Sequence, residues 1–120
     1  LGNNFLSDEG FIAVLEAMKD NTNLEWLGVE GNNITDVGGL AFAEFLKTNH
    51  PSLKTVSLWG NHLTDESAFA IAEALESNVT LETLNLHANN DITEEGKAAL
   101  QPFGDFFHGY GTVNHPKFTE

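Results

Sequence analysis

A spacing of apolar residues that occurs three times constrains this chain more than any other feature. The segments LEWLGVEGNN, LKTVSLWGNH and LETLNLHANN begin at Leu24, Leu53 and Leu81, so one frame recurs after 29 and then 28 residues. In each copy, leucine or valine occupies the first, fourth and sixth positions. Neither the 3.6-residue period of a helix nor the two-residue period of a strand produces these steps. The chain is therefore built from sequence repeats.

Other columns of the repeat agree with this frame. An asparagine follows each apolar trio, and the opening LGNN supplies an earlier copy of it. A serine or threonine then stands where a helix N-cap belongs, and an acidic residue follows it, which suits the positive end of a helix dipole. A second asparagine column closes each copy, at Asn21, Asn49 and Asn78. The N-cap column is Ser7, Thr35, Thr64 and Thr93.

The pattern L-x-x-L-x-L-x-x-N-x-L followed by a helix resembles the leucine-rich repeat. The repeat length resembles the ribonuclease-inhibitor-like subclass, which also occurs in NOD-like receptors, the Ran GTPase-activating protein and tropomodulins. The resemblance implies an α/β fold, a right-handed solenoid or short horseshoe with parallel strands on the concave face and helices on the convex face. It covers residues 1–101, as a partial repeat 1–23 and repeats 24–52, 53–80 and 81–101; residues 102–120 form an aromatic-rich cap or tail.

The apolar trio is predicted to fill the core, and the asparagine that follows it marks a turn. In the family this side chain bonds to backbone groups of the turn, because an unpaired buried amide costs about 1–3 kcal/mol. The resemblance therefore implies an asparagine ladder, made of Asn4, Asn32, Asn61 and Asn89. The simpler alternative is that asparagine only tolerates the turn geometry.

Positions three, five and seven of each copy are predicted to point away from the core and to line the concave face in three rows. Small side chains in the middle row predict a shallow trough. Tryptophan is enriched at binding hot spots, so the two tryptophans are predicted to anchor a partner; the alternative is that they only shield the sheet. The predicted partner-binding rows are Trp26, Thr55 and Thr83; Gly28, Ser57 and Asn85; and Glu30, Trp59 and His87.

Charge and composition narrow the classes of partner. The chain has 18 acidic residues against 5 lysines, no arginine and a net charge of -13. Such a chain repels nucleic acid and anionic membranes, whereas a basic or apolar protein surface would bind it. The alternative is that the acidity only maintains solubility. No apolar run is long enough to span a membrane, and the absence of cysteine weakly favours the reducing cytoplasm.

Signals for catalysis, cofactors or metals are poor. The five histidines are scattered, and no zinc motif, P-loop or nucleophile elbow occurs. Asp105, His108 and His115 form only a weak candidate metal site. Ser57 and His87 fall in different rows with no acid to orient the histidine. We therefore expect no enzymatic activity, no cofactor and no metal.

The sequence predicts a non-catalytic protein-interaction module or scaffold that binds through its concave face. Because the first repeat is incomplete, we expect a fragment of a larger protein. Three alternatives remain: a regulator of a small GTPase, although this chain lacks the arginine on which the Ran GTPase-activating protein relies; an actin-filament end-binding protein, as in tropomodulins; and a structural subunit of a large assembly. The aromatic tail, residues 103–118, is either a cap or a second contact with a partner.

Overall fold

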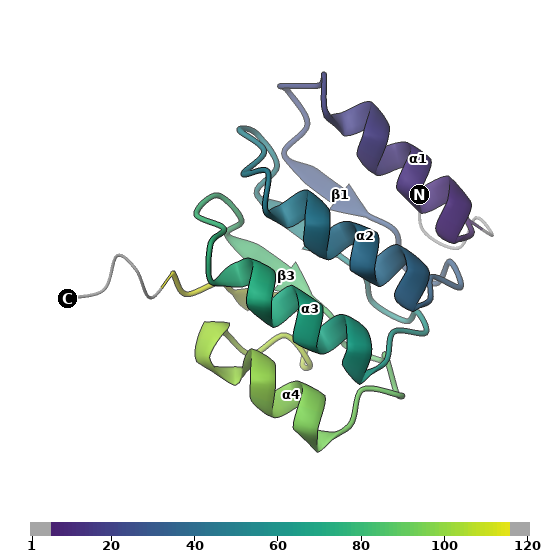
Figure 1. The fold of residues 1–120 in the computed structure, drawn as a ribbon, viewed down its shortest axis with the longest axis vertical. Helices are drawn as coiled ribbons and strands as arrows, with labels where there is room; N and C mark the ends of the chain where they lie inside the picture. Colours follow the sequence, from purple (N-terminus) through teal and green to yellow (C-terminus); the bar gives the residue numbers. More distant parts are fainter. Residues whose placement is uncertain (1–5, 116–120) are drawn as a thin grey trace.

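The computed structural model describes residues 6–115, in which helices alternate with short strands (Figure 1). The helices lie side by side in one layer in front of the strands. We call the outer surface of this layer the helix face, and the outer surface of the sheet the strand face. The elements are α1 (Asp8–Met18), β1 (Trp26–Gly28), α2 (Asp36–Leu46), β2 (Thr55–Ser57), α3 (Asp65–Leu75), β3 (Thr83–Asn85), α4 (Glu94–Leu100), a 3-10 helix η1 (Gln101–Phe103) and β4 (Gly111–Thr112).

The sheet has the order β1-β2-β3-β4. The first three strands are parallel and in register, so that Trp26 pairs with Thr55 and Thr55 with Thr83. Each parallel pair is joined by a helix that crosses over the core, as parallel strands require. The predicted α/β solenoid of stacked repeats is thereby confirmed.

The core lies between the two layers and is filled by the apolar trios and by the inner sides of the helices. Val29, Val56, Leu58, Leu84 and Leu86 are fully buried, and Phe11, Phe42 and Ile71 meet them from the helices. Burial of such side chains stabilises the fold by about 1.5–3 kcal/mol each. The expectation for Leu24 was wrong, because 37% of this residue is exposed. It precedes β1, whose outer edge has no strand partner within residues 6–115.

Each helix begins at the predicted N-cap. The side-chain oxygen of Thr35 accepts a hydrogen bond from the backbone N–H of Val37, and Thr64 and Thr93 do the same for Glu66 and Glu95. Such caps stabilise a helix by about 1 kcal/mol each. Ser7 caps α1 by accepting from the backbone N–H of Gly10, three residues later.

The asparagines after the strands bond across neighbouring repeats. The Asn61 side-chain oxygen accepts from the backbone N–H groups of Asn32 at 2.9 Å and of Ile34 at 3.0 Å, and its amide donates to the carbonyl of Val29 at 3.0 Å. The amides of Asn32 and Asn89 make equivalent bonds with Leu6 and with Leu58 and Leu63. All three asparagines are buried. Asn4 lies outside the described residues.

A second ladder joins the helix N-termini. The carboxylate of Asp8 accepts from the backbone N–H of Thr35 at 2.8 Å and from its hydroxyl at 2.5 Å. Asp36 bonds Thr64 in the same way, and Asp65 bonds Thr93. The sequence suggested only a helix-dipole role for these aspartates. Each one instead ties its own helix to the N-cap of the next.

The loop between α2 and β2 departs from the predicted alignment. In the other loops, Asn21 and Asn78 accept hydrogen bonds from the backbone two and three residues later. His50, not Asn49, does this after α2: its Nδ1 accepts from Leu53, and its Nε2 donates to the carbonyl of Met18 at 2.8 Å. The ring therefore replaces an asparagine amide, and the extra residue of this loop lies before it.

The segment after α4 packs against the last repeat. Phe103, Phe106 and Val113 are buried, and β4 pairs antiparallel with β3. The backbone N–H of Leu86 donates to the carbonyl of Phe106 at 2.7 Å. Residues 103–113 thus occupy the position that a further parallel strand would take.

Among the described residues, no helix is both long and apolar enough to cross a membrane.

Candidate protein-binding surface

The two tryptophans are the largest exposed side chains on the strand face. Trp26 is 48% exposed and Trp59 is 41% exposed. Thr55 and Thr83 continue the row of Trp26 and are half-buried. Beyond the strands, Glu30 and His87 flank Trp59, because the carbonyls of Trp59 and His87 accept from the backbone N–H groups of Gly31 and Gly60. The residues of the first row, and those of the third row, therefore lie next to one another on neighbouring repeats.

The middle row differs from the prediction, because Gly28, Ser57 and Asn85 are buried and do not line an open trough. The Asn85 side-chain oxygen accepts from the backbone N–H of His87 at 3.0 Å, and the Ser57 hydroxyl accepts from that of Trp59. These polar side chains thus bond to their own strands.

At Gly28, the indole of Trp26 covers the backbone. A Cβ atom placed there would lie 2.3 Å from the nearest indole carbon, far inside van der Waals contact. Only glycine at this position leaves room for the indole of Trp26 in the place that it occupies. The indole of Trp26 therefore covers Gly28, which does not form part of an open trough.

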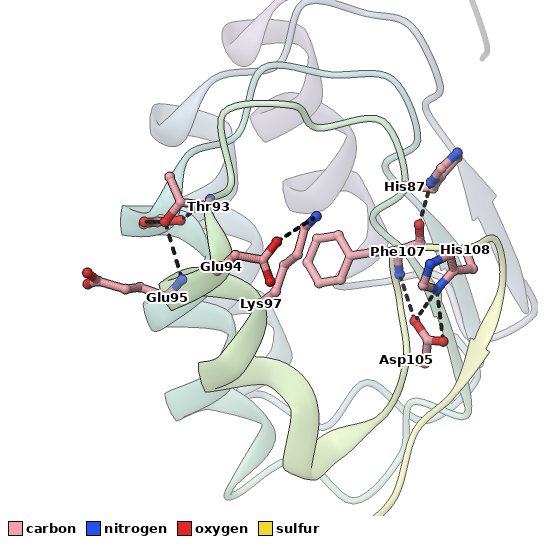
Figure 2. A network of polar contacts seen from close by, with 9 residues as sticks. His87, Thr93, Glu94, Glu95, Lys97, Asp105, Phe107 and His108 are labelled. Carbon is pink, nitrogen blue, oxygen red and sulfur yellow. Dashed lines mark hydrogen bonds and ion pairs between the residues drawn. The ribbon is translucent and has the colours of Figure 1, made fainter.

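His87 contacts the C-terminal segment (Figure 2). Its Nδ1 donates to the carbonyl of Phe107, so the ring is tied to the residues that cover the last repeat. The remaining surface of His87 is exposed. This histidine joins the predicted binding surface to the segment that contains the predicted second contact.

A groove of about 680 Å³ lies between α4 and the C-terminal segment. Lys97 lies over the ring of Phe107, with Nζ 5.5 Å from the ring centroid, and reaches Glu94 at 3.8 Å. On the other side of the groove, the His108 ring donates to Asp105 at 3.0 Å. This hydrogen bond, together with one from the backbone N–H of Phe107, holds the pKa of Asp105 below its ordinary value. Acidic and basic side chains both line the groove, and they contact one another as Lys97 with Glu94 and His108 with Asp105.

The side chains of Ser57, His87 and His115, which the sequence offered as hydrolytic or metal-ligating candidates, each bond to backbone groups in the structure. The hydroxyl of Ser57 is buried and points to its own backbone. His115 lies between the carbonyl oxygens of Asn78 and Leu81, at 2.9 Å and 2.7 Å, away from the pair formed by Asp105 and His108. Within residues 6–115, no group of three metal-ligating side chains comes together.

Sequence reasoning missed the links that join the strand face to the C-terminal segment. The tail that contains Phe107 was expected to be a cap or a second contact, but the contacts of Phe107 with His87 and Lys97 were not predicted, because the segment after Pro102 leaves the repeat frame and has no column to align. The excess of aromatic residues there was the available signal. It predicted burial or docking, but it did not predict which strand the segment would join.

Comparisons with known proteins agree with this architecture. A family model described as "Leucine Rich repeat" matches residues 20–43 and 49–72. A solved structure titled "Leiomodin-1 Actin-Binding Site 2 (ABS2)" has a TM-score of 0.70 and 27% sequence identity to this chain. The alignment covers 79% of this chain and 55% of that structure, so this chain spans about half of its length. No curated protein sequence matches at a significant level.

Proposed function

Because this chain is a leucine-rich repeat protein, we propose that it binds another protein through its strand face and has no catalytic activity of its own. The observation that supports this proposal is the presence of two half-exposed tryptophans on the strand face. Tryptophan buries a large area with little loss of conformational entropy, and it dominates many binding interfaces. Trp59 and Trp26 are the proposed anchors.

Acidic side chains beside the sheet define the charge of the proposed partner. Glu25 and Glu82 precede β1 and β3 and are exposed, and Glu30 follows β1 and is half-buried. Lys54 is the single basic residue among these positions. With a net charge of -13 over the chain, the surface favours a partner with a basic rim around an apolar centre.

The test is affinity capture with the immobilised chain, followed by titration of the captured partner against variants. Trp59→Ala is expected to weaken partner binding by about 1–3 kcal/mol, because it removes a hot-spot side chain. Val79→Ala is the matched control, since Val79 is also an exposed apolar residue but lies in the loop after α3. Circular dichroism must show equal folding of both variants. Unchanged partner binding by the double variant Trp26→Ala/Trp59→Ala would exclude the strand face.

Actin binding is a second candidate function, favoured by one observation. The structure with a TM-score of 0.70 is titled as an actin-binding site, and the similarity extends over 79% of this chain. An assay of pyrene-labelled actin polymerisation, with and without the chain, tests this candidate. If adding the chain changes the rate of filament growth, actin is supported as the partner. If filament growth is unchanged and the captured partners are proteins other than actin, this candidate is excluded.

A further inference from the structure

We infer that the helix face forms a second docking surface, which fits a basic segment of a partner protein with apolar side chains along one side. The fifth residue after each N-cap is Ile12 in α1, Leu40 in α2 and Phe69 in α3. Leu40 is 37% exposed and Phe69 is 47% exposed, and Ile12 is half-buried. A helix that only covers a core presents polar residues outward, so an apolar row across three helices calls for a partner.

A groove between α1 and α2 continues this apolar row. It has a volume of about 330 Å³, and Leu15, Ala41 and Phe45 form its apolar part together with Ile12. Leu15 and Phe45 are almost fully buried and form the floor, whereas Ile12 lies at the edge. The groove is thus open to one or two apolar side chains of a partner segment. Neighbouring helices lie side by side in Figure 1, so a segment crossing them meets the groove and the row in succession.

Acidic side chains border the row on both sides. The exposed residues two positions after the N-caps include Glu9 and Glu66, and those nine positions after them include Glu16, Glu44 and Glu73. Two lysines lie nearby, and both are engaged: Lys19 contacts Glu16 at 2.9 Å, and Lys47 contacts Glu44 at 3.2 Å and Glu73 at 3.4 Å. The hydrogen bond to Glu44 raises the pKa of Lys47 above its ordinary value. Acidic groups remain in excess around the row.

This charge pattern selects the occupant. A second copy of the chain would bring the same glutamates against one another, and like charges at an interface suppress association. An anionic membrane is repelled for the same reason. A basic segment instead gains attraction at the rim while its apolar side chains cover Leu40 and Phe69. The surface lies on the opposite side of the molecule from Trp26 and Trp59, so one chain can join two partners.

The experiment measures binding of a fluorescein-labelled amphipathic peptide, LKKLLKLLKKLLKL, to the full chain by fluorescence anisotropy. Leu40→Gln/Phe69→Gln is expected to raise the Kd by about tenfold, because it removes two apolar contacts of a docking site. The matched control Val79→Gln removes an exposed apolar side chain elsewhere and is expected to leave the Kd unchanged. The peptide with glutamate in place of lysine is expected not to bind, and added salt is expected to weaken binding of the basic one.

The outcomes separate this surface from the strand face. Trp59→Ala is expected to bind the basic peptide as the parent chain does, whatever its effect on the captured partner. An equal Kd for Leu40→Gln/Phe69→Gln and the parent chain overturns the inference, as does an equal loss in Val79→Gln. Sedimentation of the chain alone gives a further test: a dimer that the double substitution disperses would assign the helix face to a second copy and overturn the basic segment.

Discussion

The Asp36 carboxylate accepts two hydrogen bonds from Thr64, from the backbone N–H at 2.9 Å and from the hydroxyl at 2.5 Å. The Ser67 hydroxyl donates to the same carboxylate. Asp36 begins α2, and Thr64 caps α3, so one side chain links two successive repeats. Because repeat arrays are stabilised mainly through the interfaces between neighbours, these bonds contribute to the stability of the whole solenoid.

Asp36→Asn is expected to destabilise the chain by about 1–3 kcal/mol, because the amide cannot accept all the hydrogen bonds that the carboxylate accepts. Urea denaturation monitored by circular dichroism measures this change in the free energy of unfolding. The matched control is Asp20→Asn at an exposed position after α1, expected to change stability by less than about 0.5 kcal/mol. Equal stability of the two variants would show that the ladder contributes nothing.

The same carboxylate predicts a pH dependence. Partial burial raises the pKa of Asp36, but hydrogen bonds from Ser67 and Thr64 outweigh this effect and hold the pKa below its ordinary value. A group whose pKa is lower in the folded than in the unfolded chain stabilises fully above the unfolded pKa, near 3.9 for aspartate, and loses this contribution as the pH falls further. The stability difference between the parent chain and Asp36→Asn is therefore expected to hold above about pH 5 and to shrink as the pH falls towards 3. A constant difference contradicts the assignment.

Asn61→Ala is expected to cost at least about 2 kcal/mol, because it leaves the N–H groups of Asn32 and Ile34 without their acceptor in a buried turn. In the parent structure, every buried side-chain nitrogen or oxygen within residues 6–115 has a hydrogen-bond partner. Thermal or urea unfolding measures the change. Asn90→Ala, at an exposed position, serves as the control and is expected to be nearly neutral.

Gly28→Ala is expected to displace the indole of Trp26 from the strand face, since a Cβ atom would lie 2.3 Å from the ring. The tryptophan emission spectrum and its quenching by acrylamide measure this displacement, and Trp59→Phe allows Trp26 to be observed alone. Unaltered quenching of Trp26 in the Gly28→Ala background would contradict the close contact. The stability cost is expected to be about 1–3 kcal/mol, as for other overpacked sites.

Most of the fold could be predicted from the sequence because the repeat frame is periodic. Columns that recur in several copies fix the strands, the N-caps and the positions of the buried asparagines. Leu24 occupies the same column as Leu53 and Leu81, but it is not buried as they are. The strand that it precedes, β1, has no partner on its outer edge within the described residues. A sequence column therefore predicts where a side chain points, while the neighbouring repeat decides whether it is covered.

The parts that could not be predicted depend on bonds between repeats or on segments outside the frame. The pairing of Asp36 with Thr64 joins residues 28 positions apart, and each already had a local explanation as a helix-end residue. His50 replaces an asparagine only because its ring nitrogens have the right spacing for two backbone partners. Ser57 and Asn85 each accept a hydrogen bond from the backbone N–H two residues later, a local pairing that alternation alone does not reveal.

The most direct measurement of partner binding at the strand face is fluorine NMR of the chain labelled with 5-fluorotryptophan. Trp26 and Trp59 are the only tryptophans in the sequence, and Trp26→Phe and Trp59→Phe assign their two resonances. When the captured partner saturates the chain, the account predicts that at least the Trp59 resonance shifts or broadens. If both resonances stay unchanged at saturation, the partner binds elsewhere and the strand-face proposal is contradicted.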